Sequence, residues 1–148
     1  MLALLMAALN LVVISGLSGS GKSHALKAFE DAGYFCVDNL PPALLPTFVE
    51  LCHQQGGEIK NVALGIDIRE RVFFGDLAKV LGELKAQGHA LQLVFLEARE
   101  EVLVRRFSES RRPHPLLPHM PVVEGVRFER ERLSELRKHA DRVIDTSN

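Results

Sequence analysis

Short apolar runs alternate along the chain with longer segments in which apolar residues recur at helical spacing. This alternation is typical of a parallel sheet that helices cover on both faces. In such folds the C-terminal ends of the strands meet at one edge, which is where α/β proteins bind their ligands. The pattern predicts a three-layer α/β fold with five parallel strands, at residues 9–14, 34–37, 62–66, 91–96 and 142–144.

Helical periods fill the segments between these expected strands, and glycine or proline marks most of their boundaries. Pro46 indicates that the second helix starts late or is kinked, because proline disrupts a helix interior. The expected helices run from Lys22 to Gly33, from just after Pro42 to before Gly56, from Asp76 to Gln87, through Val102, Leu103 and Phe107, and from Val122 to His139. The second has Leu44, Leu45, Phe48, Val49 and Cys52 at helical spacing, the third has Leu77, Leu81 and Leu84 on one face, and the last has Val126, Leu133 and Leu136 facing inward.

Residues 108–121 interrupt this pattern, because they hold four prolines and show no apolar periodicity. A segment of this kind between two helices predicts a loop or a lid. His114 and His119 lie within it, and we expect both to be surface side chains and not metal ligands.

Composition excludes several functional classes. With 18 basic and 19 acidic residues, the net charge of -1 gives no global attraction to nucleic acid or to an anionic membrane. Residues 1–14 are almost wholly apolar, but the run lacks a basic start and is shorter than the ~20 residues that span a bilayer. Cys36 and Cys52 have neither disulfide nor zinc spacing, so we expect two buried, reduced thiols in a cytoplasmic protein with no membrane association.

Gly16 to Ser23 reads Gly-Leu-Ser-Gly-Ser-Gly-Lys-Ser, between an expected strand and an expected helix. In this P-loop pattern the glycines let successive backbone N–H groups point at phosphate oxygens. Lys22 is expected to reach the β- and γ-phosphates and Ser23 to bind Mg²⁺, while the helix N-terminus adds positive potential. The sequence predicts a P-loop domain that binds ATP or GTP with Mg²⁺ through Gly16, Leu17, Ser18, Gly19, Ser20, Gly21, Lys22 and Ser23.

A P-loop enzyme also needs a carboxylate near a strand end, to hold Mg²⁺ and orient the attacking nucleophile. Asp67 and Asp38 each follow an expected strand, so both should lie at the ligand-binding edge of the sheet. With Lys22 they form the expected catalytic set, and Asp67 joins Ser23 as a metal ligand. Glu97 also ends a strand, but its position just before a helix favours a structural role as a cap.

Arginines cluster around the expected lid. Planar guanidinium groups are suited to gripping a phosphate during transfer, which makes such a cluster a candidate for closing over a nucleotide. Arg69, two residues after Asp67, either contacts the phosphates or is a solvated loop side chain. The expected lid arginines are Arg105, Arg106, Arg111 and Arg112.

Four segments together resemble the RapZ family, the RNase adapter and nucleotide-binding proteins of bacteria. They are Ser15 to Ser23 (SGLSGSGKS), Gly33 to Pro41 (GYFCVDNLP), Arg105 to Leu116 (RRFSESRRPHPL) and Ala140 to Ser147 (ADRVIDTS). The likeness extends from residue 10 almost to the end of the chain. It implies slow ATP and GTP hydrolysis, and a C-terminal domain that binds small RNA and an amino-sugar phosphate.

The resemblance also assigns residues. Gly16 to Ser23 match the family's ATP loop, and Asp67, Ile68, Arg69 and Glu70 match its proposed GTP-binding segment. The family usually has Asp-Val-Arg-Asn there, so Glu70 replaces a neutral amide and its hydrogen-bond donation to a nucleotide is in question. We expect one domain over residues 9–148 after an N-terminal extension of residues 1–8, with the family's C-terminal domain absent because the chain stops soon after the last strand.

Three functions remain open from the sequence. In the first, nucleotide occupancy regulates a partner domain that engages small RNA and an RNase. In the second, the order of P-loop, Asp38, Asp67 and arginine lid resembles nucleoside monophosphate and shikimate kinases, which favours a small-molecule or nucleotide kinase. In the third, the motif is only a structural turn. Assembly into a homo-oligomer stays open, as does the choice between ATP and GTP.

Overall fold

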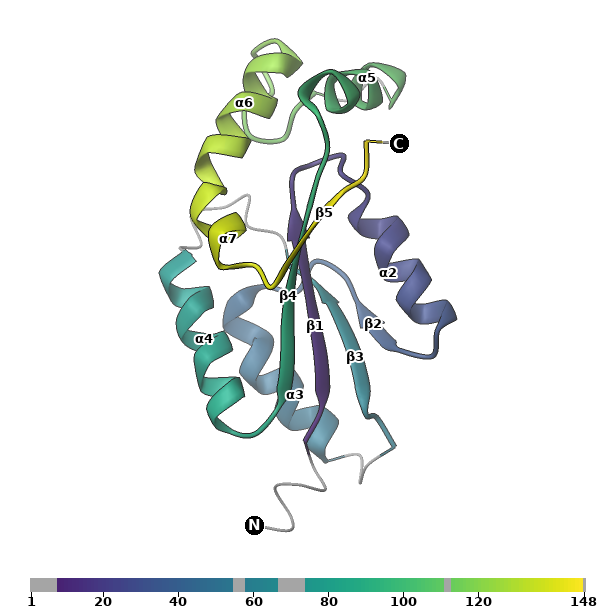
Figure 1. The fold of residues 1–148 in the computed structure, drawn as a ribbon, viewed down its shortest axis with the longest axis vertical. Helices are drawn as coiled ribbons and strands as arrows, with labels where there is room; N and C mark the ends of the chain where they lie inside the picture. The colour runs from purple at the N-terminus through teal and green to yellow at the C-terminus, as the bar shows by residue number, and fades with distance from the viewer. Residues whose placement is uncertain (1–7, 55–57, 67–73, 111–112, 148) are drawn as a thin grey trace. The chain divides into compact units, whose positions relative to one another are not determined.

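A computed structural model describes residues 8–54, 58–66, 74–110 and 113–147 of the chain. Its strands form one five-stranded sheet in the order β2-β3-β1-β4-β5 (Figure 1). The three strand pairs whose register is known are all parallel. The expectation of a five-stranded parallel α/β fold is therefore confirmed. The strands are β1 (Asn10–Gly16), β2 (Phe35–Val37), β3 (Asn61–Gly65), β4 (Ala90–Glu97) and β5 (Arg142–Asp145).

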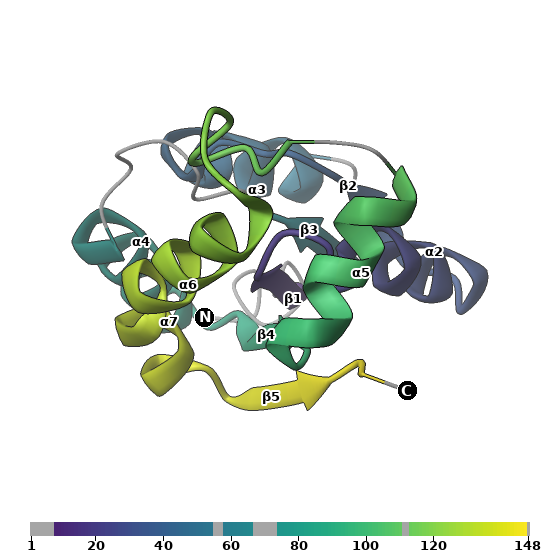
Figure 2. The same ribbon diagram turned by 90° about the horizontal axis from the view of Figure 1, so that it is seen from above.

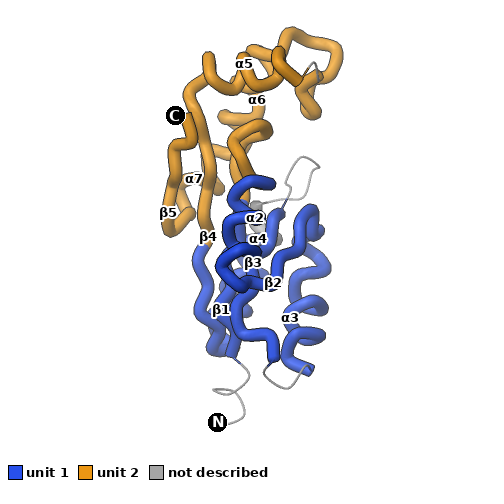
Figure 3. The backbone as a smooth tube through the Cα atoms, turned by 90° about the vertical axis from the view of Figure 1, so that its right-hand side faces the viewer, with its two compact units in different colours: residues 1–14, 23–92 blue, residues 15–22, 93–148 orange. Residues whose placement is uncertain are grey.

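The chain divides into two compact units, coloured separately in Figure 3. The first contains residues 1–14 and 23–92, and the second contains residues 15–22 and 93–148. The helices are α2 (Lys22–Asp31), the 3₁₀ turn η1 (Pro42–Leu44), α3 (Leu45–His53), α4 (Phe74–Ala86), α5 (Glu100–Ser110), α6 (Val122–Arg132) and α7 (Ser134–His139).

In the first unit, α2 lies on one face of the strands and α3 and α4 lie on the other (Figure 2). Strand β3 is buried from its second residue onward, as expected for a strand covered on both faces. The helices contribute Leu26 from α2, Leu45 and Val49 from α3, and the expected face of Leu77, Leu81 and Leu84 from α4 to the buried core.

In the second unit, α5 lies on one side of β4 and β5, and α6 and α7 lie on the other (Figures 1 and 2). Val126, Leu133 and Leu136 are buried as their spacing predicts. By contrast, β5 is exposed along its whole length, including Val143 and Ile144, because it forms an edge of the sheet.

Four sequence expectations need correction. The last helix is two helices, because the Ser134 hydroxyl donates to the Glu131 carbonyl at 2.8 Å where the chain turns at Leu133. Residues 108–110 continue α5 and are not part of the loop, since the first proline comes only at Pro113. Leu44 is exposed because it ends the 3₁₀ turn and precedes the helical face. Cys52 is buried as expected but Cys36 is only half-buried, and both thiols are free.

Candidate phosphate-binding site

The P-loop segment, residues 15–22, belongs to the second unit and runs from the last two residues of β1 to the first residue of α2. Its first residues are fixed in the core, since Ser15 and Leu17 are each about 1% exposed. The Leu17 amide donates to the Leu96 carbonyl of β4 at 3.1 Å, and the Ser20 amide donates back to the Leu17 carbonyl at 3.0 Å. The loop therefore curls into a tight turn on a rigid base.

Two glycines are required by this curl. A Cβ at Gly16 would collide with backbone atoms of Leu96, which only a residue without a side chain can approach so closely. Gly21 lies in open space but has a φ of 102°, a conformation that residues with a Cβ rarely adopt. The spacing of the motif thus follows from one packing constraint and one backbone constraint.

Lys22 and Ser23 open α2 immediately after the loop. The Lys22 ammonium reaches back to the Gly16 carbonyl at 3.4 Å, so its charge lies over the turn. The Ser23 hydroxyl belongs to an exposed residue in the first turn of the helix. The motif predicts that this charge and the start of α2 bind an anion, and that binding stays a prediction.

Arg106, an expected lid arginine, is bound to the loop itself. Its guanidinium donates to the Gly19 carbonyl at 2.8 Å and to the backbone carbonyl of Thr146. The Thr146 hydroxyl in turn donates to the Ser20 carbonyl at 2.6 Å. Two segments that are distant in sequence therefore bind backbone carbonyls of the loop, and these hydrogen bonds help to fix the orientation of the turn. Arg105 is exposed, and Arg111 and Arg112 lie outside the described residues.

A buried carboxylate also contacts the loop. Glu129 of α6 is 2% exposed and accepts hydrogen bonds from the Ser18 amide at 2.6 Å and the Ser18 hydroxyl at 2.7 Å. His114 is fully buried beside it, with Nε2 at 3.4 Å from Glu129 Oε1. The expectation that His114 is a surface side chain is wrong, because the segment after Pro113 folds inward against α5 and α6.

Neither Glu129 nor His114 was predicted as a functional residue from the sequence. A signal for Glu129 existed, since it falls on the same helical face as Val126, Leu133 and Leu136, all of which are buried. A carboxylate on the apolar face of a helix is expected to be buried, and a buried carboxylate needs a hydrogen-bonding partner. His114 gave no comparable signal, because the segment around it has no period.

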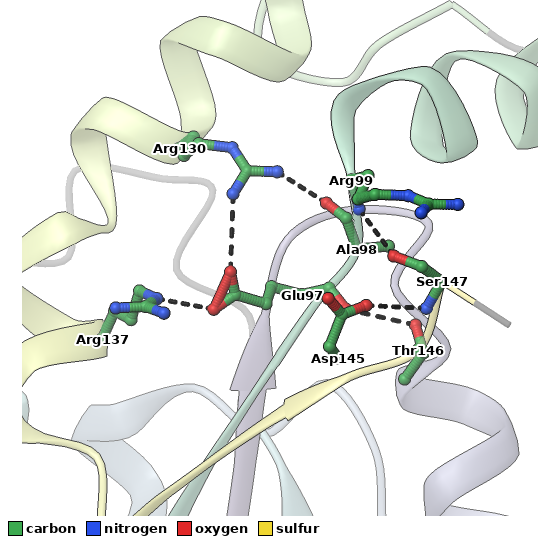
Figure 4. A network of polar contacts seen from close by, with 8 residues as sticks. All are labelled: Glu97, Ala98, Arg99, Arg130, Arg137, Asp145, Thr146 and Ser147. Carbon is green, nitrogen blue, oxygen red and sulfur yellow. Dashed lines mark hydrogen bonds and ion pairs between the residues drawn. The ribbon is translucent and has the colours of Figure 1, made fainter.

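The Glu97 carboxylate pairs with arginines of two helices (Figure 4). It pairs with Arg137 of α7 at 2.6 Å and with Arg130 of α6 at 3.5 Å. Arg130 also donates to the Ala98 carbonyl at 2.6 Å. At the end of β5, hydrogen bonds from Ser147 lower the pKa of Asp145, and Arg99 and Arg130 add to the effect. The network joins β4 to α6 and α7, the two helices on one side of it.

The remaining predicted residues are not brought together by the described structure. Asp38 belongs to the first unit, where its carboxylate accepts the Asn39 amide at 2.8 Å, so its role beside the loop stays a prediction. Asp67, Ile68, Arg69 and Glu70 lie outside the described residues. Across the described part of the chain, no group of three or more potential metal-binding side chains is found. No helix in that part is long and apolar enough to cross a membrane.

The fold and the loop together define the class of protein, a P-loop α/β domain of the kinase-like type. The structure is similar to shikimate kinase from Bacteroides thetaiotaomicron, with a TM-score of 0.62 at 16% identity, over 94% of this chain and 88% of that one. It is also similar to a gluconokinase from Sinorhizobium meliloti, with a TM-score of 0.54 at 20% identity, over 94% and 83% of the two chains. At these identities the likeness concerns the fold alone.

Sequence comparison identifies the family. The model of the RapZ-like N-terminal domain matches residues 9–148, and the chain belongs to this family. It is 50% identical over 139 residues to a nucleotide-binding protein of Clostridium botulinum, covering 94% of this chain and 47% of the relative. It is 52% identical over 143 residues to one of Desulforudis audaxviator, covering 97% and 49%. The chain thus spans about half the length of these relatives, and the predicted family resemblance is confirmed.

Proposed function

We propose that this domain binds ATP or GTP through residues 16–23 and hydrolyses it slowly. The observation that carries the proposal is the loop itself, with its required glycines, the Lys22 ammonium over the turn and the helix that begins there. The relatives that are half identical to this chain are named nucleotide-binding proteins, which supports the same assignment. Because the net charge of the chain is -1, no global field attracts anions, and the loop is the proposed source of anion binding.

Magnesium would accompany the nucleotide, since Mg²⁺ is held mainly by substrate phosphates with few protein ligands. The exposed Ser23 hydroxyl fits this demand, and Asp67 is the proposed second ligand. Bound there, the ion would offset charge on the β- and γ-phosphates. Lys22 would contact the same phosphates, and Asp67 or Asp38 would orient the water that attacks the γ-phosphorus. Ile68, Arg69 and Glu70 would line the nucleotide beside Asp67.

We assign the domain a regulatory role in a longer, RapZ-like cytoplasmic protein. Nucleotide occupancy would set the state of a following domain that binds small RNA and delivers it to an RNase. The support is family membership together with relatives about twice as long as this chain. A kinase that transfers the γ-phosphate to a metabolite is the second candidate, favoured by the shared fold with shikimate kinase and gluconokinase.

Calorimetry on Lys22→Ala tests the nucleotide assignment. Wild-type chain should bind Mg-ATP or Mg-GTP, and the variant should lose at least about tenfold in affinity because a charge-assisted phosphate contact is removed. Lys27→Ala is the matched control, since Lys27 is an exposed lysine of the same helix. Equal binding by wild type and Lys22→Ala would leave the motif as a structural turn.

Two further assays separate regulation from catalysis. A longer relative that contains the second domain should change its RNA affinity when ATP or GTP is added, and equal affinities with and without nucleotide would contradict the regulatory role. A panel of phosphate acceptors, followed by ³¹P NMR, should yield only inorganic phosphate and the nucleoside diphosphate. A phosphorylated metabolite would favour the kinase instead.

A further inference from the structure

The contact between Glu129 and Ser18 joins α6 to the third residue of the phosphate loop. We propose that Glu129 is a positioning residue that fixes the first turn of the loop and, through His114, couples nucleotide occupancy to the segment that contains His114. The inference rests on the proposed nucleotide binding, but it concerns residues that lie outside the motif. All three residues belong to the second unit.

The geometry at Glu129 is that of a built contact. Both of its oxygens are engaged by one residue, with the amide on one and the hydroxyl on the other. Hydrogen bonds to an ionised carboxylate are shorter and stronger than neutral ones, and a buried carboxylate without such donors would be costly. Because the Ser18 amide is fixed in this way, the direction of the backbone entering Gly19 to Lys22 is fixed as well.

His114 carries the contact further. Its Nδ1 accepts the Leu116 amide at 3.1 Å, so in the neutral ring the proton resides on Nε2, which faces Glu129 Oε1 at 3.4 Å. That separation is longer than an ordinary hydrogen bond, and no described atom satisfies Nε2 at closer range. Phe107 packs on the ring with a centroid distance of 5.2 Å, and a Cβ at Gly125 would collide with it.

Among these polar contacts, the one between His114 and Glu129 is the longest. Ser18 and Glu129 are tightly bonded, whereas the His114–Glu129 separation leaves room to shorten. Phosphates bound by the amides after Ser18 would immobilise the turn and therefore the carboxylate, which favours a shorter contact with His114. If nucleotide binding stabilises the His114–Glu129 contact, then by linkage a ligand or partner that stabilises this contact would strengthen nucleotide binding by the same factor.

Variants at Glu129 test the positioning role by calorimetry with Mg-ATP and Mg-GTP. Glu129→Gln keeps the shape, can accept the Ser18 amide and can donate to the Ser18 hydroxyl, so affinity should stay within about threefold of wild type. Glu129→Ala leaves the turn unsupported and should weaken binding at least about tenfold. Glu131→Ala, at an exposed position of the same helix, should bind like wild type.

An NMR readout distinguishes coupling from a merely structural role. In the wild-type chain, Mg-ATP should shift the ¹⁵Nε2 resonance of His114, and in Glu129→Ala the shift should be lost at nucleotide saturation. If Glu129→Ala does not fold, Ser18→Ala serves, because it removes one of the two bonds and should reduce both the affinity and the His114 shift.

The outcomes separate the two proposals. If the wild-type chain binds neither Mg-ATP nor Mg-GTP, nucleotide binding itself is wrong. If it binds and His114 does not respond, or if Glu129→Ala binds as tightly as wild type, the positioning role alone is overturned.

Discussion

Two histidines of the first unit, the buried His89 and the half-buried His53, lie in contact. His89 is 4% exposed, and its Nδ1 accepts the Leu9 amide at 3.0 Å. The proton of the neutral ring therefore lies on Nε2, which donates to His53 Nε2 at 3.2 Å. Burial lowers the pKa of His89, and the neighbouring His53 lowers it further. A charged His89 would lose the acceptor that Leu9 requires.

This pair predicts that stability falls on acidification. Below the unfolded-state pKa of about 6.5, the unfolded chain binds a proton that folded His89 resists, so the free energy of unfolding decreases as pH falls toward the lower folded pKa. Above pH 6.5 the contribution is fully present. Urea unfolding between pH 5 and pH 8 measures the slope.

The matched variant for this test is His89→Asn, whose side-chain oxygen can still accept the Leu9 amide but does not titrate. It should flatten the slope between pH 5 and 6.5 even if it lowers stability overall. His24→Asn, at an exposed position of α2, should leave the slope unchanged. An unchanged slope in His89→Asn would assign the pH dependence to other groups.

At the scale of elements, the network around Glu97 links strand β4 to helices α6 and α7 (Figure 4). The Glu97 side chain is 13% exposed, whereas Arg130 and Arg137 are 40% and 50% exposed. Glu97→Gln keeps the shape but removes the charge that both guanidinium groups share. We expect it to lower the free energy of unfolding by about 1–2 kcal/mol, because hydrogen bonds to charged groups are worth that much when partly buried.

Glu135→Gln is the control for Glu97, since Glu135 pairs with Lys138 at 3.3 Å with both side chains more than half exposed. Exposed pairs of this kind contribute little, so the control should change stability by less than about 0.5 kcal/mol. Denaturant midpoints of the two variants provide the comparison. Equal effects would mean that Glu97 is no more than a surface charge.

The elements themselves were largely predictable, because their signals are local. The faces of α4 and of residues 122–139 followed from spacing alone, and Leu77, Leu84, Val126 and Leu136 are buried as predicted. The break at Leu133 was not, because it depends on one hydroxyl bonding to a carbonyl. The phosphate loop was predictable for the same reason as the helices, since its geometry is encoded in eight consecutive residues.

The surroundings of the loop were not predictable, because they depend on contacts between distant parts of the chain. Glu129 lies 111 positions from Ser18, and Thr146 lies 126 positions from Ser20. The sequence around either residue of each pair does not indicate which residue it contacts. Arg106 was assigned to a lid from its neighbours, whereas in the structure its guanidinium binds the Gly19 carbonyl.

At the scale of the whole molecule, the described residues combine the phosphate loop with an exposed edge strand. The edge strand β5 leaves Val143 and Ile144 exposed at 40% and 45%. The curated relatives are about twice as long as the chain. For the domain alone, the property that its fold and loop predict is stability linked to nucleotide.

That linkage gives the last prediction. At a Mg-ATP concentration about 100 times Kd, binding to the folded state alone adds about 2.7 kcal/mol to the free energy of unfolding. For a domain of this size the melting temperature should rise by roughly 5–10 °C, and it should continue to rise with the logarithm of the nucleotide concentration. Lys22→Ala, whose affinity should be at least about tenfold weaker, should show a clearly smaller rise over the same range, while Lys27→Ala should follow wild type. A rise of equal size in wild type and in Lys22→Ala would mean that the nucleotide binds away from the loop, because the substitution removes the contacts that the Lys22 ammonium makes.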